Sequence, residues 1–531
     1  MRFPAFVALV LLHFPLVFLL ATSTSISENF LECLSHTSNN SIPITDVLYT
    51  PNDSSYSSIL KSSIQNRRFL SSTSTPKPQY IITPLNESHI QAAVICSKKH
   101  GLQIRVRSGG HDYEGLSYTS DTQFVIIDLF NLRQVSIDVK DETAWVQAGA
   151  TVGEVYYRIA EKSSTLGFPA GTCPTVGVGG HFSGGGIGTL MRKYGTSADN
   201  IEDAYLIDVN GTLLNRESMG EDLFWAIRGG GGASFGVIFS WKIKLVQVPS
   251  TVTVFTVSKT LGQGATDVLA KWQLVADKLD RRLFIRAFIQ TVNGTAANNK
   301  TIQVSFQSLF LGTISELLPL MKTSFFQLGV AAKDCTETSW IKSAMYNNNF
   351  PANSPTAVLL NKSLPSKKFF KAKSDFVREP IKDFHLKKIW KLLLQEDQTP
   401  IMIWEPLGGR MSEISESATP FPHRLGNLYN IQYFMPWQEE GYNAATKHVR
   451  SVQRLYNYMS PYVSCSPRAA YVNYKDLDLG QNEGLSTSYS KARIWGEMYF
   501  KNNFARLAMV KRKIDPGNFL RNKQSIPPLL V

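Results

Sequence analysis

The spacing of apolar residues predicts alternating strands and helices in the first half of the chain. A short apolar run at 80–82, helical spacing over 86–100 and a second run at 103–107 indicate a β-α-β unit. Its second strand leads into a glycine loop at 108–110, which suits contact with a phosphate or a planar ring. The further elements expected in this half are strands at 124–127, 144–148, 203–209 and 235–246 and a helix at 152–163.

The pattern changes near Val248, where the glycine motifs end and long strands begin to alternate with amphipathic helices. Motif-like sequence returns at Tyr471. We therefore expect an α+β protein in which a second sheet covers a site built by the first part. The expected long strands lie at 252–257, 284–290 and 302–311, and one C-terminal helix carries Trp495, Tyr499, Phe504 and Leu507.

The N-terminus has the composition of a secretory signal peptide, with a positive start, an apolar run to Leu20 and small residues from Ala21. A signal anchor is the alternative. No other apolar run is long enough to span a bilayer. We therefore expect a glycoprotein of the secretory pathway, in the apoplast or the vacuole. The candidate N-glycosylation sites are Asn39, Asn52, Asn86, Asn210, Asn293, Asn299 and Asn361.

The net charge of +13 is spread thinly along the 531 residues. Basic runs are short, and no basic stripe with interleaved aromatic residues appears, which argues against a nucleic-acid partner. The charge is more typical of a solvated surface that favours an acidic cell wall or anionic glycans.

The stretch 171–188 is unusual because eight of its eighteen residues are glycine. We expect neither a helix nor a regular strand there, since glycine loses much backbone entropy in both. Its backbone suits close contact with an anion or a flat ring, although a plain glycine-rich connector is the alternative. Cys173 lies near its start, and His111 follows the other glycine loop. A metal site is disfavoured because only His181 could complete the ligand set, so a covalently held planar cofactor with a diphosphate fits better.

Two motifs resemble those of a known family. Residues 107–118 read RSGGHDYEGLSY, and residues 171–186 read GTCPTVGVGGHFSGGG. Both look like the flavin motifs of the plant berberine bridge enzyme-like family. The resemblance continues through 222–238, 470–480, 493–497 and 521–528, so it covers essentially the whole mature chain.

The resemblance implies a two-part FAD-binding domain of the vanillyl-alcohol oxidase (PCMH) type with a substrate domain inserted between its parts. The implied division is a signal peptide at 1–24, FAD-binding parts at 25–249 and 470–531, and an α+β substrate domain at 250–469. The FAD is expected to be bicovalent, bonded to His111 at the 8α-methyl and to Cys173 at C6. The other cofactor-binding residues that the motifs imply are Arg107, Ser108, Gly109, Gly110, Gly177, Gly179, Gly180, His181, Ser183 and Gly184.

Five cysteines leave at least one without a disulfide partner in an oxidising compartment. The resemblance pairs Cys33 with Cys96 and gives Cys173 to the cofactor. Cys335 and Cys465 are then expected to be buried thiols.

Catalysis in this family implies hydride transfer to flavin N5 and a base that takes a proton from the substrate. Tyr474 resembles the tyrosine base of the cannabinoid-forming members, although a phenol needs a cation or a hydrogen bond to act as a base at neutral pH. A core tyrosine on a buried strand is the alternative. Tyr113 would flank the same cavity. Gln432 stands where bridge-forming members carry a glutamate base, and an amide there can only orient the substrate.

Three departures argue against a monolignol substrate. Asn430 replaces a lysine of the monolignol-oxidising members, Ile187 replaces a tyrosine, and Glu405–Leu407 replaces Asn-Pro-Tyr. With no lysine at hand, a pocket-facing Glu405 needs another cation, which a protonated amine would supply, so an alkaloid substrate is favoured. The alternative is that Glu405 faces away and pairs with a surface residue such as Arg410.

The sequence therefore predicts a monomeric FAD-linked oxidase of plant specialised metabolism that acts on a bulky alkaloid or prenylated phenolic. Oxygen-using members resemble this chain at Val176 and at the unobstructed Gly171, so O2 is the expected acceptor and H2O2 the product. The alternatives are a cyclase that uses FAD as a scaffold, a carbohydrate or monolignol oxidase, and a catalytically idle wall or defence glycoprotein. Intact His111 and Cys173 favour redox chemistry.

Overall fold

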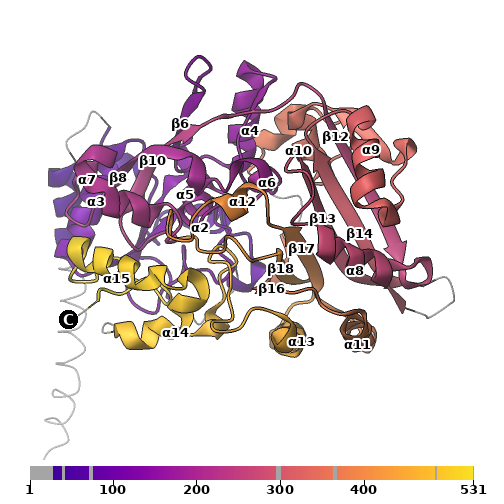
Figure 1. The fold of residues 1–531 in the computed structure, drawn as a ribbon. Helices are drawn as coiled ribbons and strands as arrows, with labels where there is room; N and C mark the ends of the chain where they lie inside the picture. The colour runs from indigo at the N-terminus through magenta and orange to yellow at the C-terminus, as the bar shows by residue number, and fades with distance from the viewer. Residues whose placement is uncertain are drawn as a thin grey trace, which may run out of the picture.

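The computed structural model describes residues 28–38, 42–70, 76–294, 300–362, 367–484 and 487–529. The predicted signal peptide and the sequons at Asn39 and Asn299 lie outside these ranges. Figure 1 shows the first half of the chain beside a large sheet, with the yellow C-terminal helices returning to the first half. This mixture of helices and sheets confirms the α+β prediction. Within the described ranges, no helix has the length and apolar character that a membrane span requires.

Two sheets build the first part of the molecule. The predicted β-α-β unit is present, and β4 lies between its two strands in the order β1-β2-β4-β3, parallel to both. The second sheet is antiparallel, in the order β5-β6-β10-β8-β9, and a two-stranded ladder joins β11 to β7. The strands are β1 Leu48–Tyr49, β2 Tyr80–Ile82, β3 Gln103–Arg107, β4 Phe124–Asp128, β5 Val135–Asp138, β6 Thr143–Gln147, β7 Leu166–Gly167, β8 Ile201–Ile207, β9 Leu213–Leu214, β10 Val237–Lys244 and β11 Val246–Gln247.

A seven-stranded antiparallel sheet forms the second part, in the order β15-β12-β14-β13-β17-β18-β16. Alternate residues of its central strands, such as Ile285, Trp404 and Ile431, pack against three helices. These are α8 (Ala265–Val275), α11 (Asp383–Leu394) and α13 (Tyr442–Met459). Because side chains alternate along a strand, the neighbours of these strand residues face the first part. The strands are β12 Val252–Thr260, β13 Leu283–Asn293, β14 Lys300–Phe310, β15 Cys335–Thr338, β16 Phe369–Val377, β17 Ile401–Pro406 and β18 Tyr429–Trp437.

The expectation that the glycine-rich stretch contains no helix is wrong. Val178–Ser183 forms helix α5. The Val178 N–H donates to Ala150 O at 2.9 Å, and the Gly179 N–H donates to Ala148 O at 3.2 Å. These tertiary hydrogen bonds and the surrounding burial outweigh the roughly 1 kcal/mol that each glycine costs in a helix.

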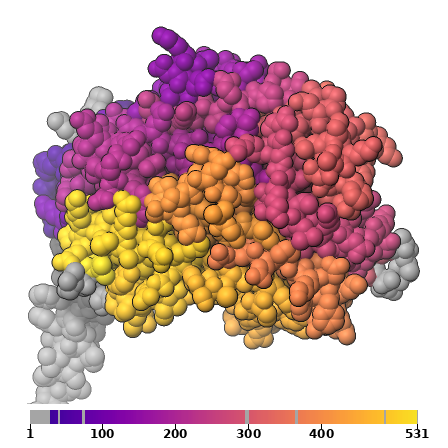
Figure 2. Space-filling model, in the orientation of Figure 1, coloured from indigo at the N-terminus to yellow at the C-terminus, as the bar shows by residue number. Residues whose placement is uncertain are grey.

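The predicted C-terminal helix is two helices, α14 (Tyr489–Phe500) and α15 (Asn503–Ile514). Lys501, with φ at 47°, ends the first of them. A Cβ at Gly496 would lie 2.4 Å from the Phe504 ring, so the two helices pack very closely at this glycine. Figure 2 shows the yellow C-terminal surface adjoining the purple surface of the first part. The remaining helices are α2 Tyr56–Ser62, α3 Glu87–Lys99, α4 Val152–Lys162, α6 Met191–Tyr194, α7 Arg216–Ile227, α8 Ala265–Val275, α9 Ile314–Ser324, α10 Trp340–Tyr346, α11 Asp383–Leu394, α12 Arg410–Glu413 and α13 Tyr442–Met459.

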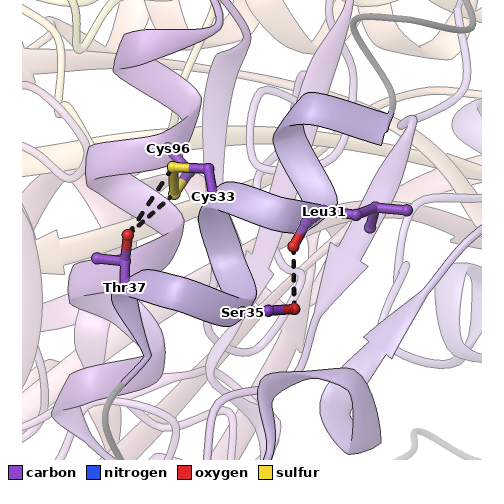
Figure 3. The surroundings of a disulfide bond; sticks show 5 residues. All are labelled: Leu31, Cys33, Ser35, Thr37 and Cys96. Carbon is purple, nitrogen blue, oxygen red and sulfur yellow. Dashed lines mark hydrogen bonds between the residues drawn. A yellow bond between two sulfur atoms is a disulfide. The ribbon is translucent and has the colours of Figure 1, made fainter.

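The predicted Cys33–Cys96 disulfide is confirmed. It ties the N-terminal helical residues 28–37 to α3, and both sulfur atoms lie near the Thr37 hydroxyl (Figure 3). The prediction for the other thiols is wrong, because Cys335 is partly exposed and Cys465 is exposed. Strand β15, which begins with Cys335, lies at the edge of its sheet, where one side of the strand has no neighbour.

Candidate active site

A cavity of about 520 Å³ lies between the glycine loops of the first part and the inner face of the seven-stranded sheet. Side chains alternate along each strand of the sheet, and those on its inner face line the cavity. The segment that follows residue 470 forms another part of the cavity wall. The glycine loops that line the cavity fall within 108–113, 171–188 and 230–236. The sheet residues that line it are Arg286, Phe288, Ile403, Glu405 and Gln432.

The glycines allow two kinds of close approach at this cavity. A Cβ at Gly109 would lie 2.3 Å from Gly177 N, so the two loops touch through their backbones. By contrast, a Cβ at Gly180 or Gly232 would meet no protein atom within 4 Å. Bare backbone therefore faces open space, where a flat ligand can lie directly against it.

His111 and Cys173 meet at one hydroxyl group. His111 Nε2 lies 2.9 Å from Thr175 Oγ1, and Cys173 Sγ lies 3.6 Å from the same oxygen. Burial lowers the pKa of His111 to about 4 and raises the pKa of the Cys173 thiol. The imidazole is therefore neutral at pH 7 and the Cys173 side chain is held as a thiol, so a ring nitrogen and a sulfur atom lie close together in one region of the cavity.

His181 fixes the loop that carries Cys173. Its Nε2 accepts a hydrogen bond from the Gly171 N–H at 2.8 Å, and burial lowers its pKa to about 4. The neutral ring therefore carries its proton on Nδ1. The Gly171 carbonyl accepts from the Tyr156 hydroxyl at 2.9 Å. Val176, three residues after Cys173, lines the cavity, and so does Gly171.

Two of the predicted cofactor-binding residues, Arg107 and Gly184, lie outside the lining of the cavity. Arg107 lies beneath its loop, where it is fully buried, pairs with Asp128 at 2.6 Å and donates to two backbone carbonyls of the α2 region. Gly184 packs against Asn473, whose Oδ1 would lie 1.9 Å from an added Cβ. Neither residue lines the cavity, whereas the other predicted cofactor-binding residues do.

Tyr474, Glu405 and Arg286 form a chain of polar contacts on the cavity wall. The Tyr474 hydroxyl donates to Glu405 Oε2 at 3.4 Å, and Arg286 NH1 lies 3.5 Å from Glu405 Oε1. Burial raises the pKa of Glu405, while Arg286 opposes that shift. Burial also raises the pKa of Tyr474 well above its ordinary value, and the charge of Glu405 adds to it. Tyr474 lies in an irregular segment, not on a strand.

Arg286 is the site residue that the sequence did not reveal. It donates to Gln307 Oε1 at 3.0 and 2.6 Å and to the Asn347 carbonyl at 3.1 Å, which fixes the guanidinium against Glu405. The alternative partner Arg410 pairs instead with Glu413. The premise that Glu405 lacks a cation in the protein is therefore wrong. Within β13, the only signal for Arg286 is a charged residue in an otherwise apolar run.

Tyr113 stacks against the ring of Tyr474, and Gln432 in turn holds the hydroxyl of Tyr113. The Tyr113 and Tyr474 rings stack with their centroids 5.7 Å apart and an interplanar angle of 5°. Gln432 Nε2 donates to the Tyr113 hydroxyl at 2.7 Å. Gln432 has no ionisable group of its own, so in this contact it can orient the Tyr113 hydroxyl but cannot act as a base.

Lys475 also lines the cavity, next to Tyr474 in the chain. No described residue forms a hydrogen bond or an ion pair with it, and its ammonium lies 5.0 Å from the Tyr499 ring centroid. Burial lowers its pKa to about 8, while the charge of Asp112 opposes the shift. Among the residues that the structure describes, no group of three His, Cys, Asp or Glu side chains could hold a metal ion.

Comparisons with known proteins assign this geometry to a family. A model described as "FAD binding domain" matches residues 78–216, and one described as "Berberine and berberine like" matches residues 470–527. The chain is 53% identical to a tetrahydroberberine oxidase from Berberis wilsoniae, over 96% of this chain and 95% of the relative. The chain belongs to the berberine bridge enzyme-like family. It is an FAD-linked oxidoreductase.

Two further members of the berberine bridge enzyme-like family act on other kinds of molecule by name. A monolignol oxidoreductase from Arabidopsis thaliana is 53% identical, over 95% of this chain and 94% of its own. The grass pollen allergen Phl p 4, described as a glucose dehydrogenase, is 46% identical with a TM-score of 0.89, over 94% of this chain and all of its own. A Phl p 4 variant with one isoleucine changed to valine is described as a glucose oxidase.

The residues of this berberine bridge enzyme-like protein fit FAD. Gly180 and Gly232 leave bare backbone against which a flavin or its diphosphate can lie. His111 and Cys173 bring nucleophilic nitrogen and sulfur to the same region, as two bonds to one ring system require. Of the family departures, Ile187 lines the cavity, whereas Asn430 and Leu407 are buried outside it.

Proposed function

We propose that this protein is an oxidase that holds FAD through His111 and Cys173 and takes a hydride and a proton from a small molecule. The chain of contacts from Tyr474 through Glu405 to Arg286 carries the proposal. It provides a proton acceptor on the wall of the cavity that also contains the two predicted flavin links. A scaffold for a cycloaddition without net redox has no need of such an acceptor.

FAD, when bound, would supply a two-electron acceptor for the substrate hydride, with O2 as the final acceptor and H2O2 as its product. Tyr474 Oη takes the proton that the substrate loses, while its own proton passes to Glu405 Oε2. Because the two transfers are coupled, a free phenolate with its high pKa does not have to form. Burial raises the pKa of Glu405 toward the working pH, where a base is most effective, and Arg286 opposes this shift by favouring the ionised carboxylate.

The substrate class that we propose is an alkaloid or a prenylated phenolic. The name of the tetrahydroberberine oxidase supports the alkaloid as one member of this class. Arg286 already supplies the cation for Glu405, so the charge argument for a protonated amine no longer holds. A neutral hydroxyl substrate suits the site equally well, because Tyr474 and Glu405 need only a proton donor.

We also propose that the protein enters the secretory pathway and acts as a monomer. The disulfide between Cys33 and Cys96 is of the kind that persists in oxidising compartments. Sequon positions that a glycosyltransferase can reach support the same route. Asn52, Asn210, Asn293 and Asn361 are exposed, and Asn86 is half-buried at the start of α3.

Anaerobic mixing of the holoenzyme with fractions of a plant metabolite extract tests the proposed function. An oxidase substrate bleaches the flavin absorbance near 450 nm, and admission of air restores the colour with release of H2O2. Formation of a product without bleaching would instead identify the scaffolded cyclase. No response of the flavin to any fraction would favour the catalytically idle glycoprotein.

The flavin-reduction rate is expected to fall as the pH drops through the raised pKa of Glu405, because a protonated carboxyl cannot accept the Tyr474 proton. In Glu405→Gln this acidic limb should disappear, and the rate should fall about a hundredfold. Anaerobic stopped-flow measurements between pH 4 and 8 check both effects. Glu413→Gln, which removes an exposed partner of Arg410, serves as the control. An unchanged acidic limb in Glu405→Gln would assign it to another group.

Val176→Leu is expected to slow reoxidation of the reduced flavin by O2 at least about tenfold, since one added methylene in a confined apolar pocket has effects of this size. Flavin reduction by substrate should stay nearly unchanged. In Phl p 4, one isoleucine-to-valine change accompanies a change of description from glucose dehydrogenase to glucose oxidase, so one apolar side chain can alter the use of oxygen in that relative. Separate stopped-flow measurements of the two half-reactions check the prediction. Equal slowing of both would show that Val176 acts through the fold.

A further inference from the structure

Five charged side chains meet in a buried cluster beside the segment that carries Tyr474. We define the charged cluster as Glu114, Lys371, Lys373, Asp476 and Asp478. Lys371 Nζ contacts Glu114 and lies 2.8 Å from Asp476 and 3.2 Å from Asp478. Lys373 Nζ lies 2.5 Å from Asp476 and 2.9 Å from Asp478. The Asp478 side chain is 33% exposed, and the other four side chains are at most 5% exposed.

The cluster joins three separate parts of the chain. Lys371 and Lys373 lie on β16, the edge strand of the seven-stranded sheet. The two aspartates follow Tyr474 by two and four residues, and Glu114 directly follows Tyr113. Each of the two stacked tyrosines, Tyr113 and Tyr474, therefore lies close in sequence to an acidic residue that is paired with Lys371 or Lys373.

Two other residues of β16 contact the surroundings of Tyr474. The Tyr471 N–H donates to Ser374 Oγ at 2.9 Å, and Phe370 packs edge-on against the Tyr113 ring at 5.1 Å. Residues 471–476 have neither helix nor strand hydrogen bonding. Strand β16 therefore anchors the segment of Tyr474 at both of its ends. Further anchors come from the His181 carbonyl, which accepts from the Asn473 amide, and from the Tyr499 hydroxyl, which accepts from the Asp476 N–H.

Within the cluster, the neighbouring charges favour the ionised forms of Lys371 and Asp478. Burial lowers the pKa of Lys371, but Glu114, Asp476 and Asp478 outweigh it, so the pKa is raised above its ordinary value. Burial raises the pKa of Asp478, but the two lysines outweigh it and lower the pKa. Charge-assisted hydrogen bonds in a low dielectric are short and directional, so they restrict the geometry of whatever they hold.

We propose that Lys371 and Lys373 are positioning residues that hold Tyr474 in contact with Glu405. The inference rests on the proposed proton transfer by Tyr474. The contact between Tyr474 and Glu405 is 3.4 Å long, so a small displacement of the segment breaks it. Misplacement of a reacting group by about 1 Å can cost on the order of a hundredfold in rate.

Lys373→Met tests this role in the holoenzyme. We expect the limiting rate of anaerobic flavin reduction to fall about 10- to 100-fold. The substrate dissociation constant should change by less than about threefold, because Lys373 does not line the cavity. Arg424→Met is the matched control: Arg424 is equally buried and pairs with Asp199 at 2.7 Å, and neither residue lines the cavity. A similar fall in rate in the control would overturn the inference.

A double-mutant cycle with Tyr474→Phe gives the decisive readout. If Lys373 acts through Tyr474, then Lys373→Met slows flavin reduction much less in the Tyr474→Phe background than it does in the wild type. Multiplicative effects would show that Lys373 acts elsewhere, and an unchanged rate in Lys373→Met would also reject the inference. If Tyr474→Phe alone leaves the rate unchanged, the proposed function itself fails. If Lys373→Met does not fold, Asp478→Asn at the partly exposed end of the cluster replaces it in the same cycle.

Discussion

Tyr474→Phe is expected to slow flavin reduction about a thousandfold, the usual scale for loss of a positioned general base. The change removes only the hydroxyl that donates to Glu405 and keeps the ring that stacks on Tyr113. The cavity therefore keeps its shape, and the dissociation constant of the substrate should change little. Anaerobic stopped-flow titration with a bleaching substrate measures both quantities.

Tyr113→Phe is the matched control for this experiment. Tyr113 is an equally buried tyrosine in the same stack, but its hydroxyl accepts a hydrogen bond from Gln432 and contacts no carboxylate. Its loss should slow reduction less than about tenfold, as expected for the loss of one neutral hydrogen bond. Equal effects of the two substitutions would contradict a special role for Tyr474. A larger effect at Tyr113 would move the base to that residue.

The second large effect concerns attachment of the flavin. His111→Ala and Cys173→Ala should each leave protein that stays yellow after acid precipitation, because one covalent bond is enough to retain the cofactor. The double variant should release essentially all of its flavin. Absorbance of the acid pellet and supernatant measures the outcome. The contacts of both side chains with Thr175 are the structural basis for two links to one ring.

Cys465→Ser is the control for loss of a thiol, since Cys465 is exposed and lies outside the cavity. It should leave the pellet fully coloured. Release of all flavin from Cys173→Ala alone would reject the two-bond model. Retention of flavin by the double variant would mean that another side chain forms the link.

Much of the site could be predicted because local sequence determines it. The residues around His111 and Cys173 lie in long motifs, and backbone contact with a flat ligand requires glycine whatever the rest of the chain does. The cavity-facing residues of β17 and β18 also follow from the alternation of side chains. Glu405 follows Trp404, and Gln432 follows Ile431. Both of these apolar neighbours pack against the helices.

Local rules failed where a distant contact outweighed them. Helix α5 forms in a glycine-rich stretch because its first N–H groups find carbonyls at 148 and 150. Arg107 is the first residue of a flavin motif, but its side chain pairs with Asp128, which is 21 residues away. Neither preference is visible in the spacing of apolar residues.

The sequence by itself determined the family motifs, the two predicted flavin links, the Cys33–Cys96 pair and the presence of a carboxylate at 405. Only the tertiary structure decided what that carboxylate does. Arg286 and Glu405 are 119 residues apart, and the pairing of Ala287 with Trp404 in the sheet brings them to one face. Strand register depends on the packing of the whole sheet, so the chain alone left Glu405 without a partner. Folding supplied Arg286 as its cation and Tyr474 as its proton donor.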